Sequence, residues 1–348
     1  MRAVVYDAYR GTPVRTEVPE PTCPPDGVLV RVGATGVCRS DWHAWMGHDP
    51  VPLPMVPGHE YAGTVDAVGT EVTRWQIGDR VIVPFACGCG QCKQCATGDT
   101  HVCPNQTQPG FTGWGSFADL VAVHAADTNL VALPESLGFL EAAALGCRVA
   151  TAYRAVVASA RVAPGEWLAV HGCGGVGLSA VMIATALGAL VVAVDVSPFA
   201  LAAARDLGAV PLDATGLNPE RVANAVHDIS GAGAHASIDA LGSVTTMTGS
   251  VLSLRPRGRH VQVGLLLSEH AAPPVPMGRL VSLELELIGA HGMPARDYPA
   301  LLELVTSGRL PLDRLVGPVI ALDGAPAALM AMSSPATHAG ITVIDLTR

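Results

Sequence analysis

A glycine-rich loop limits the possible folds of this chain more than any other segment. The apolar run WLAVH ends at His171, and glycines follow at positions 172, 174 and 177 in the pattern G-x-G-x-x-G. The apolar run predicts a buried strand, and the Ala-rich stretch that continues to Leu187 predicts a helix. Glycines between such elements let the backbone approach a pyrophosphate at the helix N-terminus. The segment therefore predicts a Rossmann unit that binds a dinucleotide.

The character of the sequence changes near residue 150. Before this point, short apolar runs such as RAVVY and DRVIVPF are separated by turn signals such as PPDG, which predicts a β-rich domain. After it, strands alternate with Ala-rich helices, which predicts a parallel sheet covered on both faces. We expect an α/β fold class, with a doubly wound sheet in one domain and a β-rich second domain.

Composition excludes several functions. The chain has 348 residues, which suits two domains, and its formal charge is −9 with Lys93 as the one lysine. Without a basic stripe, neither nucleic acid nor an anionic membrane is expected as a partner. Residues 178–194 are nearly apolar, but Gly188 divides them into a helix and a strand. Asp7 interrupts any N-terminal signal core, so a cytoplasmic location is expected.

Four cysteines in one short stretch predict a metal-bound lobe. Cys89, Cys92, Cys95 and Cys103 give C-x2-C-x2-C-x7-C. In a reducing compartment metal ligation is favoured over disulfides, and four thiolates fill the tetrahedral shell of a structural Zn²⁺. An iron–sulfur cluster is the alternative, because proline follows the last cysteine, although the spacing differs from ferredoxin runs. Cys87 could replace Cys89, but the even spacing favours Cys89.

A second set of metal-binding side chains is spread over the first 150 residues. Cys38 lies in GVCRSDWH, His59 and Glu60 lie in PGHEYAG, and Cys147 lies in ALGCRVATAY. Each alone is typical of ordinary packing. Two thiolates and one imidazole, with the fourth position open, are the ligand set of a catalytic zinc such as that of alcohol dehydrogenase.

The chain resembles the zinc-dependent alcohol dehydrogenases of the medium-chain dehydrogenase/reductase superfamily over essentially its whole length. Residues 58–63 meet the signature G-H-E-x-x-G, and the cysteine lobe and glycine loop follow in the family order. The resemblance implies a GroES-like catalytic domain over residues 1–148, with the zinc lobe at about 87–103. It implies a Rossmann NAD-binding domain over 149–289 and a segment 290–348 that completes the catalytic domain. The implied activity is reversible hydride transfer between NAD(H) and an alcohol, aldehyde or ketone.

The resemblance also assigns the metal ligands. Cys38, His59 and Cys147 would hold a catalytic zinc, which polarises the substrate oxygen, and Glu60 would either support these ligands from outside or alternate with one of them. The expected content is two zinc ions per chain, one catalytic and one structural. Polyol dehydrogenases of the superfamily usually have Glu where this chain has Cys147. Arg148 departs from the family, which usually has a small residue there.

A proton relay is expected next to the first ligand. Ser40 would receive the substrate proton and His43 would release it to solvent, because an imidazole exchanges protons near neutral pH. The alternatives are a capping hydroxyl and a surface histidine. Asp41 is expected to hydrogen-bond the imidazole of His59, with a helix N-cap as its alternative role.

The resemblance places further residues at the cofactor. Asp195 ends the strand VVAVD, 18 positions after Gly177, and a carboxylate there would bind the ribose hydroxyls and favour NAD over NADP. The alternative is that Asp195 caps the helix near Pro198. The other candidates contact the pyrophosphate or the nicotinamide, and are Arg39, Thr151, Gly172, Gly174, Gly175, Val176, Gly177 and Val263.

The substrate pocket and the assembly are predicted more coarsely. Phe85, Trp45 and Trp114 are candidate pocket walls, and they favour an apolar alcohol or ketone, although each could equally be core. The chain lacks the long insertion of dimeric animal-type enzymes and resembles the shorter bacterial form, which implies a homotetramer, with a homodimer as the alternative. A polyol or threonine dehydrogenase, and a non-catalytic protein that binds NAD and zinc, are the competing functions.

Overall fold

The computed structural model describes residues 1–335 and 337–348. The chain forms two compact units. The first comprises Met1–Ala150, Gly292–Pro335 and Gly340–Arg348, and the second comprises Thr151–His291 with residues 337–339. The chain therefore leaves the first unit after Ala150, returns to it at Gly292, and contributes residues 337–339 to the second unit before it ends in the first.

The second unit contains a six-stranded parallel sheet in the order β10-β9-β8-β11-β12-β13. If the strands of the unit are numbered in sequence order, this is 3-2-1-4-5-6, the order of a doubly wound dinucleotide-binding fold. The order in which strands are added reverses between β8 and β11, although all strands are parallel. The predicted Rossmann topology is confirmed. The strands are β8 (Trp167–His171), β9 (Leu190–Asp195), β10 (Val210–Asp213), β11 (Ala234–Asp239), β12 (Leu254–Gln262) and β13 (Glu286–Gly289).

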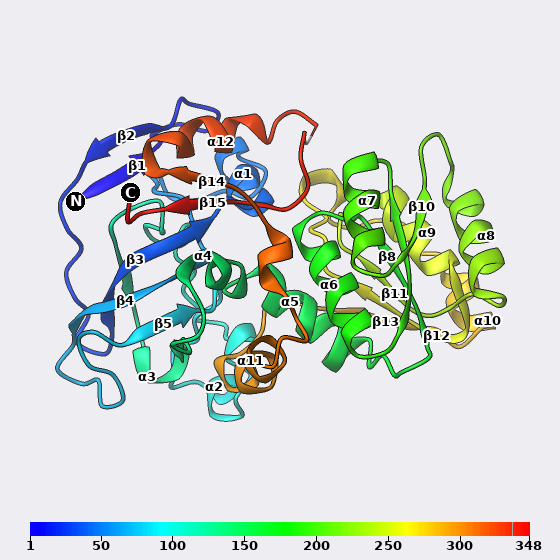
Figure 1. Cartoon of the computed structure of the whole chain (residues 1–348), viewed down its shortest axis with the longest axis horizontal. Helices are drawn as coiled ribbons and strands as arrows, with labels where there is room; N and C mark the ends of the chain where they lie inside the picture. Colours follow the sequence, from blue (N-terminus) through cyan, green and yellow to red (C-terminus); the bar gives the residue numbers. More distant parts are fainter. Residues whose placement is uncertain (336) are drawn as a thin grey trace. The chain divides into compact units, whose positions relative to one another are not determined.

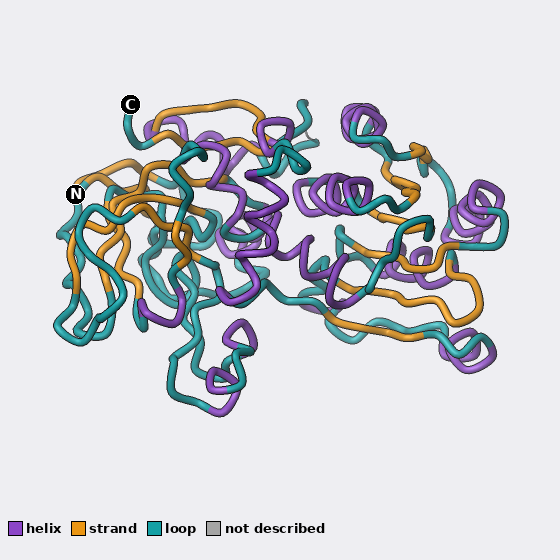
Figure 2. The backbone as a smooth tube through the Cα atoms, turned by 60° about the horizontal axis from the view of Figure 1, so that its bottom comes forward, coloured by secondary structure: helices purple, strands orange, loops and turns teal. Residues whose placement is uncertain are grey.

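Helices cover this sheet on both faces, as Figure 2 shows. Helices α6 and α7 contact each other, and so do α8 and α9. Valines of β9 and α8 pack into one buried cluster, which explains why these strands read as nearly continuous apolar runs. The helices are α6 (Gly175–Ala186), α7 (Pro198–Asp206), α8 (Pro219–Ser230), α9 (Val244–Leu252) and α10 (Met277–Ser282).

The first unit is built on antiparallel strands around β3 (Figure 1). This nine-residue strand is buried at every position but one, and it pairs with β4, β6 and β15. Gly63 of the signature lets β4 approach it closely, because a Cβ there would lie 2.1 Å from the carbonyl oxygen of Arg31. The strands are β1 (Arg2–Val5), β2 (Val14–Glu17), β3 (Val28–Gly36), β4 (Tyr61–Val68), β5 (Arg80–Val83), β6 (Leu120–Val123), β7 (Val131–Ala132), β14 (Val316–Ala321) and β15 (Ile341–Asp345).

Short helices connect these strands and carry the chemistry-bearing residues. The α-helices are α1 (Arg39–Met46), α2 (Lys93–Ala96), α3 (Ala126–Asn129), α4 (Phe139–Ala142), α5 (Arg148–Arg154), α11 (Tyr298–Thr306) and α12 (Ala325–Ala331). Turns of 3₁₀- or π-helix occur in both units and are η1 (Thr100–Val102), η2 (Ala143–Leu145), η3 (Ala155–Ser159), η4 (Ser268–His270), η5 (Ala295–Asp297), η6 (Leu312–Leu315) and η7 (Leu322–Gly324).

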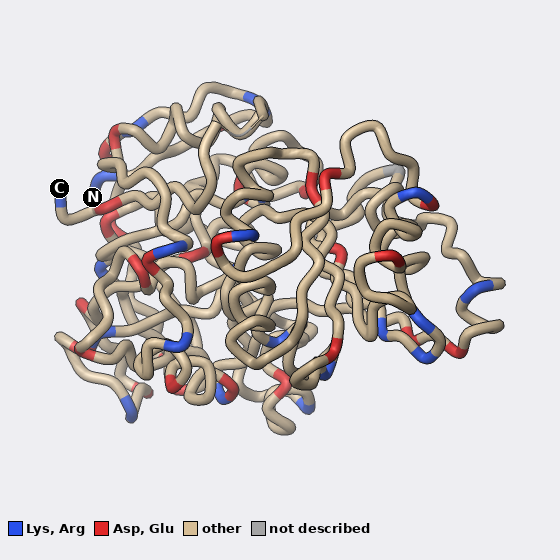
Figure 3. Tube along the Cα trace, turned by 45° about the vertical axis from the view of Figure 1, so that its right-hand side comes forward, with Lys and Arg blue, Asp and Glu red and all other residues tan. Residues whose placement is uncertain are grey.

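Charged residues of both signs are interspersed along the chain in Figure 3. In this view the described residues form no basic stripe, in agreement with the formal charge of −9. A search of the described helices for one with the length and hydropathy to cross a bilayer finds none.

Two histidines on interior strands of the Rossmann sheet, His171 of β8 and His260 of β12, are buried. His171, at the end of β8, is buried, and its Nε2 lies 3.4 Å from the hydroxyl of Ser253. Burial, assisted by the nearby His260, lowers the pKa of His171 to about 3. The folded state therefore holds this imidazole neutral at pH values where an unfolded chain would protonate it.

This burial predicts acid sensitivity. Because the folded pKa lies below the unfolded value of about 6.5, the unfolded state binds the extra proton first, and stability present at neutral pH is lost as the pH falls from about 6.5 toward 3. In His171→Asn the free energy of unfolding should fall less steeply on acidification, by up to about 1.4 kcal/mol per pH unit. Denaturant unfolding at several pH values measures this difference. The exposed His338→Asn is the control, and equal slopes in all three proteins would contradict the prediction.

Candidate functional site

Three buried side chains from separate segments meet in the first unit. Cys38 follows β3, His59 precedes β4, and Cys147 precedes α5. Their ligand atoms all lie within 4.8 Å of one another. The Nε2 of His59 is buried and has no hydrogen-bond partner among the residues that the structure describes. An orphaned imidazole nitrogen beside two thiols fits a metal ion, because a buried polar atom without a partner is otherwise costly.

The carboxylate of Asp41 sets the geometry of two of these ligands. Its Oδ1 accepts from Nδ1 of His59 at 2.8 Å and from the backbone N–H of Gly58 at 3.1 Å, and its Oδ2 accepts from the backbone N–H of Cys38 at 2.9 Å. The hydrogen bond predicted between Asp41 and His59 is present. The N-cap of α1 is Cys38, with Asp41 at the third helical position. Because Asp41 pairs with Nδ1, Nε2 is the nitrogen of His59 that a metal ion would bind in place of a proton.

The local charges favour an ionised thiolate. A hydrogen bond from Cys147 holds the pKa of Cys38 well below its usual range, against the opposing effect of burial. Burial opposes charge on His59, but the carboxylate of Asp41 and the Cys38 thiolate outweigh it and raise the pKa of the imidazole. The thiolate is the form of cysteine that binds metals.

Glu60 does not join the three ligands, although it follows His59 directly. Its Oε1 accepts from the backbone N–H of Arg148 at 2.8 Å, and its Oε2 accepts from Nε of Arg148 at 2.6 Å and from Nη2 of the same side chain. Both residues are buried. Burial raises the pKa of Glu60 and the guanidinium opposes that rise. The sequence marked Arg148 as unusual but missed this ion pair, which joins positions 88 residues apart.

Helix α1 carries the expected relay residues on one face. Ser40 and His43 are half-buried and three positions apart. The Nδ1 atoms of His43 and His48 lie 3.2 Å apart, a contact that the sequence did not suggest. Burial, with His48 and Arg39 nearby, lowers the pKa of His43 to about 4, below the neutral range that the sequence analysis assumed. His43 is therefore uncharged at neutral pH and a weaker base than a free imidazole.

Two phenylalanines flank His59. The rings of Phe85 and Phe111 lie 6.0 and 5.1 Å from its ring, both edge-on, and Phe111 was not among the predicted residues. Trp45 instead packs in a core cluster with Tyr6 and Met55, and its indole N–H donates to the carbonyl of Gly11. The indole N–H of Trp114, which is 37% exposed, donates to the carbonyl of Pro54. These contacts favour packing roles for both tryptophans.

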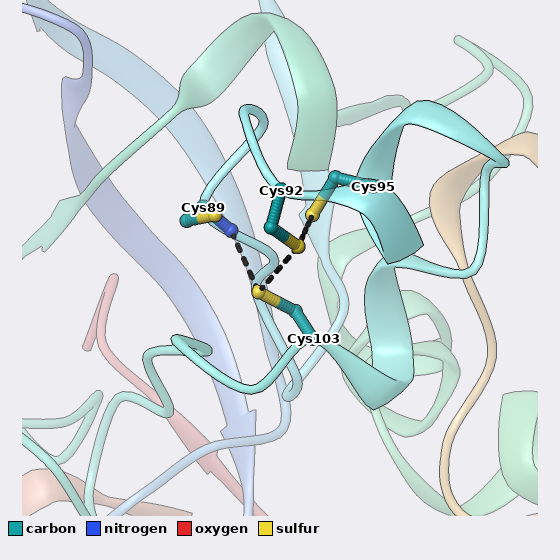
Figure 4. A group of neighbouring side chains, drawn as sticks. All are labelled: Cys89, Cys92, Cys95 and Cys103. Atoms are coloured by element: carbon teal, nitrogen blue, oxygen red, sulfur yellow. Dashed lines mark hydrogen bonds between the residues drawn. The ribbon is translucent and has the colours of Figure 1, made fainter.

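The second group of side chains that could hold a metal ion is the cysteine lobe drawn in Figure 4. The ligand atoms of Cys89, Cys92, Cys95 and Cys103 lie within 4.8 Å of one another, and the sulfur of Cys92 is 3.5 Å from that of Cys95 and 3.6 Å from that of Cys103. These sulfurs are free thiols rather than disulfides. Such separations suit sulfurs on one tetrahedral ion with bonds of about 2.3 Å.

The lobe also decides between Cys87 and Cys89. The buried thiol of Cys87 points to the carbonyl of Pro84 and lies outside the group, and burial raises its pKa to about 12. Backbone hydrogen bonds, chiefly near Gln91, lower the pKa of Cys89 to about 6. The lobe is fixed at Gly88, whose backbone exchanges two hydrogen bonds of 2.8 Å with the side chain of Asn129.

The three glycines of the loop in the second unit have separate structural roles. Gly172 has a φ of +87°, which favours glycine, and turns the chain out of β8. Gly174 is exposed at the N-cap of α6, and a Cβ there would meet nothing within 4 Å. A Cβ at Gly177 would lie 1.9 Å from the carbonyl oxygen of Gly172, so the helix packs closely there. This division of roles fits a pyrophosphate at the helix N-terminus.

Asp195 lies at the end of β9 beside this loop. Its Oδ2 accepts from the backbone N–H of Cys173 at 2.6 Å, and its Oδ1 accepts from those of Val196 and Ser197. The cap of α7 is Ser197, whose hydroxyl accepts from Ala200. Asp195 therefore braces the glycine loop. Three of the roughly four acceptor positions of its carboxylate are used, which leaves room for a further donor.

The remaining cofactor candidates divide between the units. Arg39, in the first unit, lies over the ring of Trp42 and donates to the carbonyl of Met332. Thr151, Gly175, Val176 and Val263 are in the second unit, and the buried hydroxyl of Thr151 has no protein partner.

Sequence comparison identifies both parts of the chain. Residues 24–135 match the family described as alcohol dehydrogenase GroES-like domain, and residues 175–307 match the family described as zinc-binding dehydrogenase. An alcohol dehydrogenase of Geobacillus stearothermophilus is 34% identical over 89% of this chain and 90% of its own length.

Solved structures agree with this result. An alcohol dehydrogenase from Thermus sp. ATN1 has a TM-score of 0.90 at 31% identity, with 99% of both chains covered. An NAD-dependent alcohol dehydrogenase has a TM-score of 0.86 at 28% identity, with 99% of this chain and 100% of the other covered. With the two cysteine-containing groups and the Rossmann loop, these matches establish that the chain belongs to the zinc-dependent alcohol dehydrogenases of the medium-chain dehydrogenase/reductase superfamily.

Proposed function

We propose that the protein transfers hydride between NAD(H) and a small, largely apolar alcohol or its aldehyde or ketone, using two zinc ions per chain. The observation that carries the proposal is the orphaned Nε2 of His59 beside Cys38 and Cys147, with Asp41 fixing its tautomer. A three-ligand set leaves a fourth position for substrate, whereas the four-cysteine lobe is closed and structural.

The metal and the cofactor supply chemistry that side chains lack. A zinc ion at the three-ligand site would lower the pKa of an alcohol oxygen, and a nicotinamide would accept the hydride. The protein's own groups hold charge and move protons. The thiolates of Cys38 and Cys147 balance a dication, and the rings of Phe85 and Phe111 give the surroundings of His59 an apolar character that favours apolar substrates over polyols.

The proton is proposed to leave along helix α1. Ser40 would pass it to His43, which is uncharged at neutral pH and has the acceptor capacity to receive it. The contact between His43 and His48 extends this path by one imidazole. If the Nδ1–H of His43 donates a hydrogen bond to His48, the Nε2 of His43 is the atom that would accept the proton from Ser40.

Cofactor choice is proposed to depend on Asp195. The carboxylate retains one acceptor position for a ribose hydroxyl and would repel the 2′-phosphate of NADP. The residues from Val196 to Phe199 offer no cation to offset that charge, and the first arginine downstream is Arg205.

A homotetramer is proposed, with a homodimer as the alternative. Among the described residues, β13 pairs on one side only, with β12, so the edge of the Rossmann sheet is open. Val281 is 76% exposed and Met277 57% exposed on the preceding α10, and Leu287 is 45% exposed on β13 itself. An open edge with exposed apolar residues favours pairing with a second copy. A cytoplasmic location is proposed because all nine cysteines are free thiols.

Metal content and turnover test the central proposal. Fresh protein should contain two zinc ions per chain and form NADH from a panel of apolar alcohols. Cys38→Ser should lose one zinc and turnover while the fold survives, whereas Cys95→Ser should lose one zinc and mainly lower the melting temperature. Cys23→Ser, outside both groups, is the control. One zinc per chain, iron in place of zinc, or NAD binding without turnover would contradict the proposal.

The relay predicts a specific loss in His43→Gln. Alcohol oxidation should fall by about ten- to a hundredfold, and the loss should shrink at high pH because hydroxide can take the proton directly. Initial rates across a pH series measure both effects. The exposed His124→Gln should behave as wild type. An unchanged rate and pH profile in His43→Gln would exclude the role.

The cofactor assignment predicts a shift in preference. Wild type should have a higher kcat/KM with NAD than with NADP, and Asp195→Ala should lower the NAD/NADP ratio by about ten- to a hundredfold, since it removes a charge-assisted hydrogen bond. Asp195→Asn keeps an acceptor oxygen and removes only the charge, so its ratio should lie between the two. If both cofactors lose the same factor, Asp195 only braces the loop.

A further inference from the structure

The side chain of Arg148 contacts two other segments, through the side chain of Glu60 and the backbone carbonyl of Val37. It is 7% exposed. Its Nε and Nη2 both donate to Oε2 of Glu60, and Nη2 also donates to the carbonyl of Val37 at 3.1 Å. Its backbone N–H donates to the other carboxylate oxygen of Glu60. One buried guanidinium therefore holds one buried carboxylate by both oxygens.

These contacts follow the ligands in sequence. Val37 precedes Cys38, Glu60 follows His59, and Arg148 follows Cys147. The guanidinium thus connects the three segments that carry the ligands, and it does so through residues that are adjacent to the ligands in sequence. Gly36 makes the space for this pair, since a Cβ there would lie 2.5 Å from Oε2 of Glu60 and 2.7 Å from Nη2 of Arg148.

The pairing determines what Glu60 can bind. A carboxylate is an accepted zinc ligand, and Glu60 begins one residue from the imidazole. Here its Oε1 already accepts one hydrogen bond and its Oε2 accepts two, all from Arg148. Without the guanidinium, this buried anion would have to take up a proton or find another cation. The adjacent metal site offers such a cation.

We propose that Arg148 is a positioning residue that holds Glu60 out of the metal's coordination shell and so keeps the fourth position open to substrate. The inference rests on the proposed function, because it presumes that Cys38, His59 and Cys147 bind the ion. It assigns to the Arg148–Glu60 pair a role in access to the metal, in addition to its contribution to packing.

Cobalt substitution tests the inference without measuring turnover. Co²⁺ at the three-ligand site has a visible spectrum that changes when imidazole takes an open position. Imidazole should bind the Co²⁺-loaded wild type. In Arg148→Met, which keeps most of the side-chain volume but no charge, Glu60 should occupy the fourth position and raise the apparent Kd for imidazole at least tenfold. The double variant Arg148→Met/Glu60→Gln, with no carboxylate to coordinate, should return the Kd to within about threefold of wild type.

Rescue by the second change separates a coordination effect from damage to the fold. An Arg148→Met protein with wild-type imidazole affinity would overturn the inference, and so would a double variant that stays as weak as the single one. If Arg148→Met does not fold, wild type and Glu60→Gln decide. The inference requires both to bind imidazole with similar affinity, and a wild type that refuses imidazole while Glu60→Gln accepts it would overturn the inference.

The same measurements keep this inference apart from the proposed function. If wild type and Cys38→Ser take up the same amount of cobalt, the three-ligand site itself is wrong. If cobalt binds at the three-ligand site but Arg148→Met binds imidazole with the wild-type Kd, the metal site is supported and the proposed role of Arg148 is wrong.

Discussion

The three-ligand site depends on the carboxylate of Asp41. This group is fully buried, and its charge is offset by N–H donors from Cys38, Gly58 and His59. Two of those donors belong to ligand residues, and the third belongs to the residue before one. A single anion therefore holds the N-cap of α1, the residue before His59 and one nitrogen of its imidazole, which leaves the other nitrogen to face a metal. Hydrogen bonds to a buried charge are among the stronger ones in proteins, so the backbone around the ligands is held before any ion binds.

Two buried carboxylates beside the site, those of Asp41 and Glu60, have different partners and different roles. Asp41 is held by groups of the ligand segments and orients them, whereas Glu60 is held by a cation and is thereby kept from acting as a ligand. The chemistry of Asp and Glu is almost the same, and their partners give them opposite roles. The pattern also explains why a ligand set cannot be read from residue types alone, since Glu60 lies as near to His59 in sequence as any residue can.

Much of the fold and of the site could be predicted from sequence, because the informative features are local. The loop glycines follow a strand within a few positions, and Cys89 to Cys103 span one short stretch, so spacing alone indicated their geometry. The Asp41–His59 hydrogen bond followed from the resemblance. Contacts between distant residues were missed. The pair of Glu60 and Arg148, the approach of Phe111 to His59 and the bracing of Cys173 by Asp195 depend on how strands pair. The lowered pKa of His43 was missed because burial is a tertiary property.

The glycine at position 36 and the buried ion pair of Glu60 and Arg148 constrain each other sterically. A Cβ on the last residue of β3 would lie 2.5 Å from Oε2 of Glu60 and 2.7 Å from Nη2 of Arg148, so the ends of these two side chains would have to move to admit it. A lineage that replaced the arginine with a small side chain would release the constraint on position 36, and one that first enlarged position 36 would lose the arginine's seat. We therefore expect the residues at these two positions to change together among relatives.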